Sequence, residues 1–246
     1  MRQYDQLHTF LREPVPEGAT YAWDFDQRLR PCLALSRLVH PTSVSLEYSA
    51  RIFYDDRGRV KEVCPGPVKG RAAGAYVLPE WRDWLIDSEL EQLRKLLAST
   101  PWTALPDRLR RALWHHELAS AQSELDVRWT LICTALEALV HTDRLKSTKQ
   151  FTTRLPLLAI EVGISGFSAS DAERTYEYRS RLAHGGTLAD VRRGTPAHVA
   201  METIPLYRMM EDILREALKK SLIDSEYAAI FNNDDAIRSH WPLDLS

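Results

Sequence analysis

Apolar residues along the chain follow two different periods, and the change of period separates its two parts. Between residues 44 and 54 every second residue is apolar or aromatic, which is the spacing of a half-buried strand. Asp55–Gly58 is typical of a turn, so Arg59–Val63 is predicted to return as the second strand of a hairpin.

From Pro106 onward the apolar residues recur at helical spacing, with Asp107 as the expected N-cap of the first helix. The segment Glu124–His141 is apolar on every side, which predicts a central, buried helix. Whether this helix continues the one before it is left open by the residues between them. With one earlier helix included, the predicted helices cover residues 87–98, 107–122, 124–141, 149–162, 169–184 and 199–222.

These elements predict an α+β protein that is mostly α, in which a small N-terminal mixed module with a β-hairpin precedes a helical bundle. The composition changes at Ser99–Pro106, where proline, serine and threonine gather. We therefore expect an N-terminal module over residues 1–104, a bundle over residues 105–224, and a short helix with a C-terminal tail over residues 225–246.

Composition and charge indicate the compartment in which the protein works more clearly than the reaction that it carries out. The 246 residues are 44% hydrophobic and 27% charged, and the net charge is −2, so nucleic-acid binding would need a local basic patch. Three cysteines without close spacing, and no secretory signal at the N-terminus, fit a reducing compartment. No apolar run is long enough to span a bilayer, so the expected localisation is cytoplasmic, with no membrane partner.

The segment richest in candidate chemistry ends the helix predicted over residues 169–184. Arg179 lies five residues before His184, and Gly185 and Gly186 close the helix. Histidine exchanges protons near neutral pH and arginine presents a permanent charge in a fork, so the pair suits reactions at phosphate. On an ideal helix the two side chains are about 140° apart. They converge only if the last turn unwinds or if a second copy of the helix supplies the partner group.

The same spacing elsewhere shows that it carries little information alone. Three other pairs share it, namely Arg110/His115, Arg111/His116 and Arg193/His198. The first two pairs are expected on a helix surface facing water, and the third in a loop with glycine and proline. The surroundings of each pair therefore have to decide which one matters.

The residues around Arg179 and His184 resemble a motif of a known family. Residues Tyr178–Gly185 resemble the signature of the HEPN superfamily, in which an Arg-polar-x3-His motif closes a helix of a small bundle. Ser180 stands at the polar position, where Asn, Asp or His is commoner. Trp129–Leu139 resembles the helix that precedes this motif in the Apea-like branch, and Phe151–Leu158 fits the helix between them. The resemblance extends over residues 106–221.

The resemblance implies a metal-independent endoribonuclease without a cofactor, acting on RNA as a homodimer whose two motifs line one cleft. In this sequence it makes His184 the acid/base group and Arg179 the cation that stabilises the phosphate, with 2′,3′-cyclic phosphate products. It also implies a role in phage defence or in a toxin system. The N-terminal module is then expected to bind a trigger, a regulatory partner or the substrate, or to cover the site.

Four neighbouring residues are candidates for supporting roles. Glu137 lies among apolar residues, where a carboxylate needs a partner, so it is expected either to orient one of the motif residues or to reach solvent at the helix edge. Ser180 is expected to support the motif. Arg181 is expected either to contact phosphate or to face water, and Tyr178 either to stack on a base or to pack in the core.

Two other functions stay open. The bundle is also consistent with a non-catalytic HEPN-like module for dimerisation, scaffolding or RNA binding. A metal hydrolase using His115 and His116 is the third reading, but adjacent histidines on a helix point about 100° apart. The His-Glu-x-x-His spacing of zinc proteases is missing as well, so no metal site is predicted.

Overall fold

The computed structural model describes residues 32–42, 50–65, 85–99, 104–122, 124–143, 145–188 and 196–243. The chain divides into two compact units, one formed by residues 1–33 with 46–71 and the other by residues 34–45 with 72–246. The division therefore falls elsewhere than the predicted boundary at residue 104. The side chains of residues 44–49 and of the Arg193/His198 pair lie outside the described part.

A β-hairpin makes up most of the described part of the first unit, and it confirms the strand prediction from residue 50 onward. Strands β1 (Ala50–Tyr54) and β2 (Val60–Pro65) pair antiparallel. In the turn, the Asp55 carboxylate accepts hydrogen bonds from the N–H groups of Arg57 and Arg59, both at 2.9 Å. Gly58 takes a φ of 72°, a conformation that glycine adopts without steric cost.

The second unit is built from helices, as the sequence predicts, and the mostly helical fold class is confirmed. Residues 32–39 are helical. The helices that follow are α2 (Asp87–Ala98), α3 (Asp107–Ser120), α4 (Leu125–Val140), α5 (Ser147–Glu161), α6 (Ala169–Ala183), α8 (Pro196–Ile223), α9 (Ser225–Ala229) and α10 (Asp234–His240).

The helix boundaries differ from the prediction mostly by one or two residues, but one cap is wrong. Pro106, not Asp107, is the N-cap of α3, and no side chain caps the helix there. Asp107 is the first helical residue, and its carboxylate pairs with Arg110 one turn later instead of accepting from the backbone. The helices α3 and α4 are separate, since the chain leaves the helical conformation after Ser120 and resumes it at Leu125.

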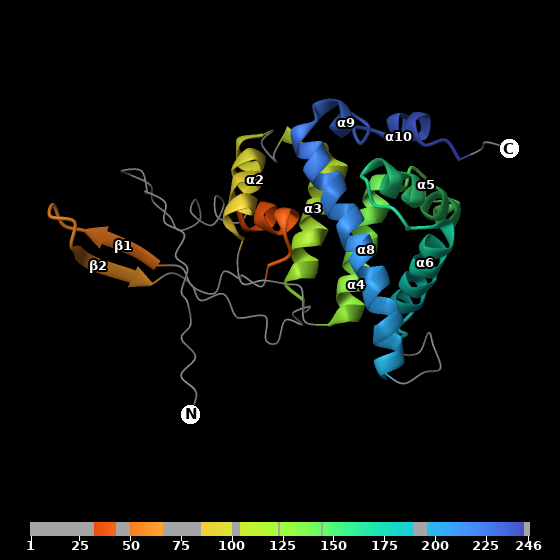
Figure 1. Ribbon diagram of the computed structural model, residues 1–246, viewed down its shortest axis with the longest axis horizontal. Coiled ribbons are helices and arrows are strands. Elements are labelled where there is room, and N and C mark those ends of the chain that lie inside the picture. Colours follow the sequence, from red (N-terminus) through yellow and green to blue (C-terminus); the bar gives the residue numbers. More distant parts are fainter. Residues whose placement is uncertain are drawn as a thin grey trace. The chain divides into compact units, whose positions relative to one another are not determined.

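Helix α4 lies at the centre of the bundle, in contact with α3, α5, α6 and α8 (Figure 1). Its side chains explain this place, because they are apolar on nearly every face. The residues without any solvent exposure include Trp129, Ile132, Ala135, Leu136 and Leu139. The predicted central, buried helix is confirmed.

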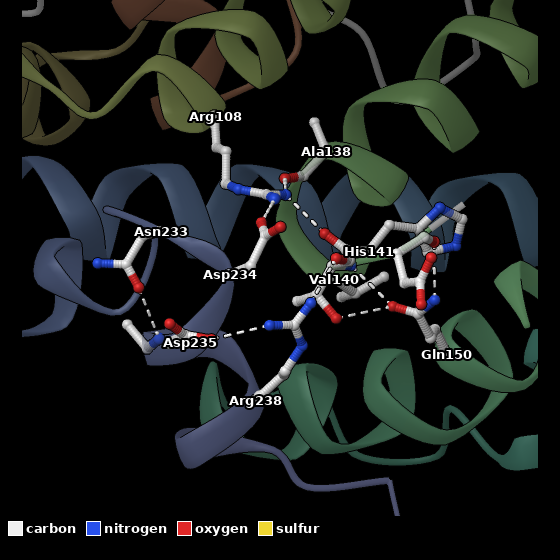
Figure 2. Close-up of polar contacts among 12 residues, drawn as sticks. Arg108, Ala138, Val140, His141, Gln150, Asn233, Asp234, Asp235 and Arg238 are labelled. Carbon is white, nitrogen blue, oxygen red and sulfur yellow. Dashed lines mark hydrogen bonds and ion pairs between the residues drawn. The ribbon is translucent and has the colours of Figure 1, made fainter. Parts of the chain in front are cut away.

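Arginine side chains take up the free carbonyl groups at the C-terminal end of α4. A helix leaves its last four carbonyls without a helical partner, and in a buried helix water cannot replace the missing donors. Arg108 of α3 donates to the carbonyls of Ala138 at 2.9 Å and His141 at 2.6 Å, and it also pairs with Asp234 of α10 (Figure 2).

Two more arginines complete this end of the helix. Arg154 of α5 is 1% exposed, and it donates to the carbonyls of Val140 at 2.7 Å and Trp241 at 2.8 Å. Arg238 of α10 donates to the carbonyl of Thr142 at 2.9 Å. Positive charge is favourable at a helix C-terminus, where the helix dipole is negative. The end of α4 therefore joins α3, α5 and α10.

Within the described ranges, no helix combines the length and the apolar character that crossing a bilayer requires.

Replacing Arg154 with methionine should lower the free energy of unfolding by about 3 kcal/mol or more, because buried carbonyls would lose their donor. The change is measured by urea denaturation at neutral pH. Arg94→Met is the matched control, since Arg94 is 73% exposed and pairs only with Glu91 on its own helix, so its loss should change stability little. Equal stability of the two variants would contradict the role of Arg154.

Candidate functional site

Helix α6 ends in a Schellman motif, which confirms the predicted glycine closure. The N–H of Gly186 donates to the carbonyl of Arg181, and the N–H of Gly185 donates to the carbonyl of Leu182, both at 3.1 Å. Gly185 has a φ of 83°, the left-handed conformation that this motif requires. Because the backbone itself closes the helix, the His184 ring is not needed as a cap.

Arg179 is held against helix α4 by a carboxylate. One terminal nitrogen of Arg179 donates to a Glu137 oxygen at 3.0 Å, and the side chains are 31% and 13% exposed, respectively. Burial raises the pKa of Glu137, while the charge and the hydrogen bond of Arg179 act in the opposite direction. Of the two readings for Glu137, the structure shows the contact with a motif residue, and that residue is Arg179. One carboxylate uses only part of the guanidinium, which has five N–H donors.

Two aromatic residues beside this pair were missed in the sequence. The Tyr176 ring centre lies 5.9 Å from the central carbon of the Arg179 guanidinium, and the His141 ring centre lies 6.4 Å from that of Tyr176. Glu137 and His141 are four residues apart on α4, and Tyr176 and Arg179 are three apart on α6, so each pair shares one helix face. That spacing was the available signal, but only the docking of the two helices shows that the faces meet.

His141 sits in this cluster as a neutral ring. Burial lowers its pKa to about 4, against a hydrogen bond with the main chain of Ser147 that raises it. The positive charges of Arg179, Arg154 and Arg108 lower the pKa further. A protonated ring would therefore stand next to three guanidinium groups, and the neutral form is the one compatible with the fold.

His184 does not join this cluster within one copy of the chain. Its side chain is exposed, and in the described part of the structure no hydrogen bond links it to Arg179. The end of α6 is tightened and not unwound, since the N–H of His184 donates to the carbonyl of Arg181, three residues earlier, at 3.1 Å. Of the two conditions under which the motif residues converge, a second copy of the helix is the one left.

The structure corrects the base-stacking role considered for Tyr178. Its side chain is 3% exposed, and its ring centre lies 5.3 Å from that of Trp129, so a base cannot reach the ring. The packing reading holds for this residue. Arg181 is exposed and pairs with Glu177 at 2.7 Å, and Ser180 is half-buried beside Arg179; no contact assigns either a role.

In the competing Arg-x4-His pairs on α3, both arginines are exposed as expected, but His116 does not face water. His116 is 1% exposed, and burial together with the charges of Arg215 and Arg37 lowers its pKa to about 3. It is a buried neutral histidine because α3 turns this face toward α8. His115 is half-buried. Among the described residues, no group of three or more His, Cys, Asp or Glu side chains is placed to hold a metal ion.

A cavity of about 290 Å³ lies in another part of the second unit. None of its lining residues belongs to α4 or α6; they are His40, Pro41, Arg208, Glu211, Asp212 and Arg215. Arg215 already pairs with Asp212 at 2.7 Å and donates to the carbonyls of Leu38 and Val39. The cavity is therefore separate from the cluster around Arg179. Its Arg215 side chain already has partners within the protein.

Comparison with protein-family models, with curated proteins and with solved structures finds no significant match to this chain.

Replacing His141 with phenylalanine should flatten the acid side of the stability profile. The folded pKa of about 4 lies below the ordinary value of 6.5, so the unfolded chain takes up a proton first as the pH falls. Wild-type stability from this residue is complete above pH 6.5 and is lost toward pH 4, at up to about 1.4 kcal/mol per pH unit.

Urea unfolding of the wild type and the His141→Phe variant at several pH values between 4 and 7 measures the difference. Phenylalanine keeps an aromatic ring against Tyr176 and Phe151, so the packing change is small. The gap in stability between wild type and variant should change steadily across the window. Two parallel profiles would show that His141 is not held neutral by the fold.

Proposed function

We propose that this protein is a metal-independent endoribonuclease of HEPN type, with Arg179 and His184 acting in a composite cleft of a homodimer. The observation that carries the proposal is the state of these two side chains. Arg179 is fixed by Glu137 yet partly exposed, and His184 is exposed at a helix end that the backbone closes without it. The resemblance of residues 106–221 to the family supports the same reading.

The chemistry requires no group beyond these side chains and the RNA. The 2′-hydroxyl of the RNA attacks the adjacent phosphorus, a base accepts its proton, and an acid gives a proton to the leaving 5′-oxygen. The products are a 2′,3′-cyclic phosphate and a 5′-hydroxyl. His184 suits either proton transfer, because imidazole titrates near neutral pH. Arg179 suits the negative charge that develops on the phosphate oxygens.

A second copy of the chain supplies what one copy lacks. One protomer offers a single exposed histidine in the motif, whereas the reaction needs a proton acceptor and a proton donor. Among the described residues, no hydrogen bond or ion pair joins Arg179 and His184 within one protomer. A two-fold axis beside the end of α6 would bring two histidines and two arginines to one cleft. The N-terminal module then binds a trigger or the substrate, or covers the cleft, in phage defence or a toxin system.

RNA cleavage by the purified protein in EDTA is the test. His184→Ala and Arg179→Ala should each reduce cleavage about a hundredfold or more without unfolding the protein, and wild-type products should carry cyclic phosphate ends. His115→Ala is the matched control, because Arg110 and His115 have the same spacing outside the proposed cleft. A scaffold would be indifferent to His184→Ala, and activity lost in EDTA would indicate a metal enzyme.

Mixing the two inactive variants tests the composite cleft. Heterodimers of His184→Ala with Arg179→Ala carry one intact histidine and one intact arginine on different copies. Mixing should therefore restore cleavage to a level well below that of wild type, because the cleft regains its cation and one of its two proton-transfer groups. If both groups act within one copy, the mixture stays as inactive as its components. Size-exclusion chromatography with light scattering reports whether dimers form.

Replacing Glu137 with glutamine tests the partner of Arg179. The amide keeps the shape but removes the charge that holds the guanidinium, so cleavage should fall roughly tenfold while Arg179 remains present. Glu177→Gln is the control, because Glu177 holds the exposed Arg181 in a similar pair. Unchanged cleavage in Glu137→Gln would contradict the orienting role.

A further inference from the structure

The Tyr176 side chain stands between the motif arginine and the interior. Its ring centre lies 5.9 Å from the Arg179 guanidinium carbon, 5.3 Å from the Phe151 ring centre and 6.4 Å from the His141 ring centre. Phe151 is fully buried, and His141 is at the end of α4. Tyr176 therefore has one side toward a packed aromatic cluster and another toward a cation.

Arg179 needs more than one contact to hold a single conformation. Its side chain has four rotatable bonds and loses considerable freedom when it is fixed. Glu137 binds one terminal nitrogen and leaves the plane of the guanidinium free to swing about that bond. A ring beneath the guanidinium, at the outer limit of cation–π distance, restricts this second motion.

We propose that Tyr176 is the positioning residue of this site, and that its ring, backed by His141 and Phe151, holds the Arg179 guanidinium in the orientation that receives an RNA phosphate. The inference rests on the proposed function for its consequence in catalysis. The contact with Arg179 itself does not depend on that function. Tyr176 acts through Arg179 and does not touch the reacting atoms.

The neighbourhood of His141 fits this role. A positive charge behind Tyr176 would compete with Arg179 for the ring and would repel the guanidinium. The charged groups that face His141 are Arg179 from α6, Arg154 from α5 and Arg108 from α3. Burial, and then these three cations, lower the pKa of His141 to about 4, so the ring behind Tyr176 is aromatic and uncharged at physiological pH.

Two substitutions separate positioning from packing. Tyr176→Phe keeps the ring face, and Tyr176→Leu keeps an apolar side chain but loses the face that attracts a cation. Tyr176→Leu should lower kcat roughly five- to tenfold with little change in KM, whereas Tyr176→Phe should stay close to wild type. Tyr176→Met, which fills space more adaptably than leucine, replaces Tyr176→Leu if the latter does not fold.

A second readout is independent of cleavage. The Nε of Arg179 is buried and has no hydrogen-bond partner among the described residues, so its N–H should exchange slowly with water. In protein labelled with ¹⁵N-arginine, the Nε–H signal assigned to Arg179 should exchange several-fold faster in Tyr176→Leu than in wild type or Tyr176→Phe. The Arg179→Ala variant identifies the signal.

The two measurements distinguish the failure of each proposal. If wild type does not cut RNA but the Arg179 signal responds to Tyr176→Leu, the nuclease function is overturned and the positioning contact is supported. If wild type cuts RNA and Tyr176→Leu matches Tyr176→Phe in both kcat and exchange, the positioning role is overturned. Faster exchange together with a lower kcat in Tyr176→Leu alone supports both.

Discussion

Helix α4 is apolar on nearly every face, and the carbonyls at its C-terminal end need donors from outside the helix. Arg108 and Arg154 donate to the carbonyls of Ala138 and Val140, and Arg238 donates to the carbonyl of Thr142 just beyond the helix. Leaving a buried carbonyl without a donor costs about 1–3 kcal/mol, which is comparable to the gain from burying one large apolar side chain. The three arginines come from α3, α5 and α10, so contacts at one helix end connect distant parts of the chain; Figure 2 shows Arg108 and Arg238.

The contacts at the C-terminal end of α4 also fix the geometry of the candidate site. Glu137 and His141 lie on the last turns of α4, so the contacts that hold this end also hold the groups facing Arg179. On the other side, the Trp129 indole packs on Tyr178 and donates to the carbonyl of Thr175 at 3.4 Å, which sets how α6 lies along α4. The residue after Tyr178 is then directed toward Glu137. The position of Arg179 is thus a product of helix packing as much as of its own sequence motif.

The sequence predicts the helices well because their apolar stripes are long and regular. The bounds of α2 agree with the prediction. The glycine closure of α6 was predictable from Gly185 and Gly186. The cap of α3 was not, because an aspartate before a helix does not reveal whether it will bond the backbone or Arg110. Tyr178 and His116 also differ from one of their readings, since only the packing of neighbouring helices decides which side of a helix is closed to solvent. The cost of burying a carboxylate predicted that Glu137 could need a partner but did not single out Arg179, and the contacts of Tyr176 and His141 required the docked helices.

The long sequence separations at the end of α4 have a consequence for the order in which the protein matures. Arg108 and Asp234 are 126 residues apart, and Arg154 and Trp241 are 87 apart. Neighbouring helix pairs such as α3 with α4 and α5 with α6 make their contacts locally and can assemble as soon as they are synthesised. At translation rates of about 5–20 residues per second, the partners from α10 follow the Arg179 motif only after several seconds. For that interval a nascent chain therefore carries the Arg179–His184 motif on α6 while the C-terminal end of α4 still lacks its contacts from α10.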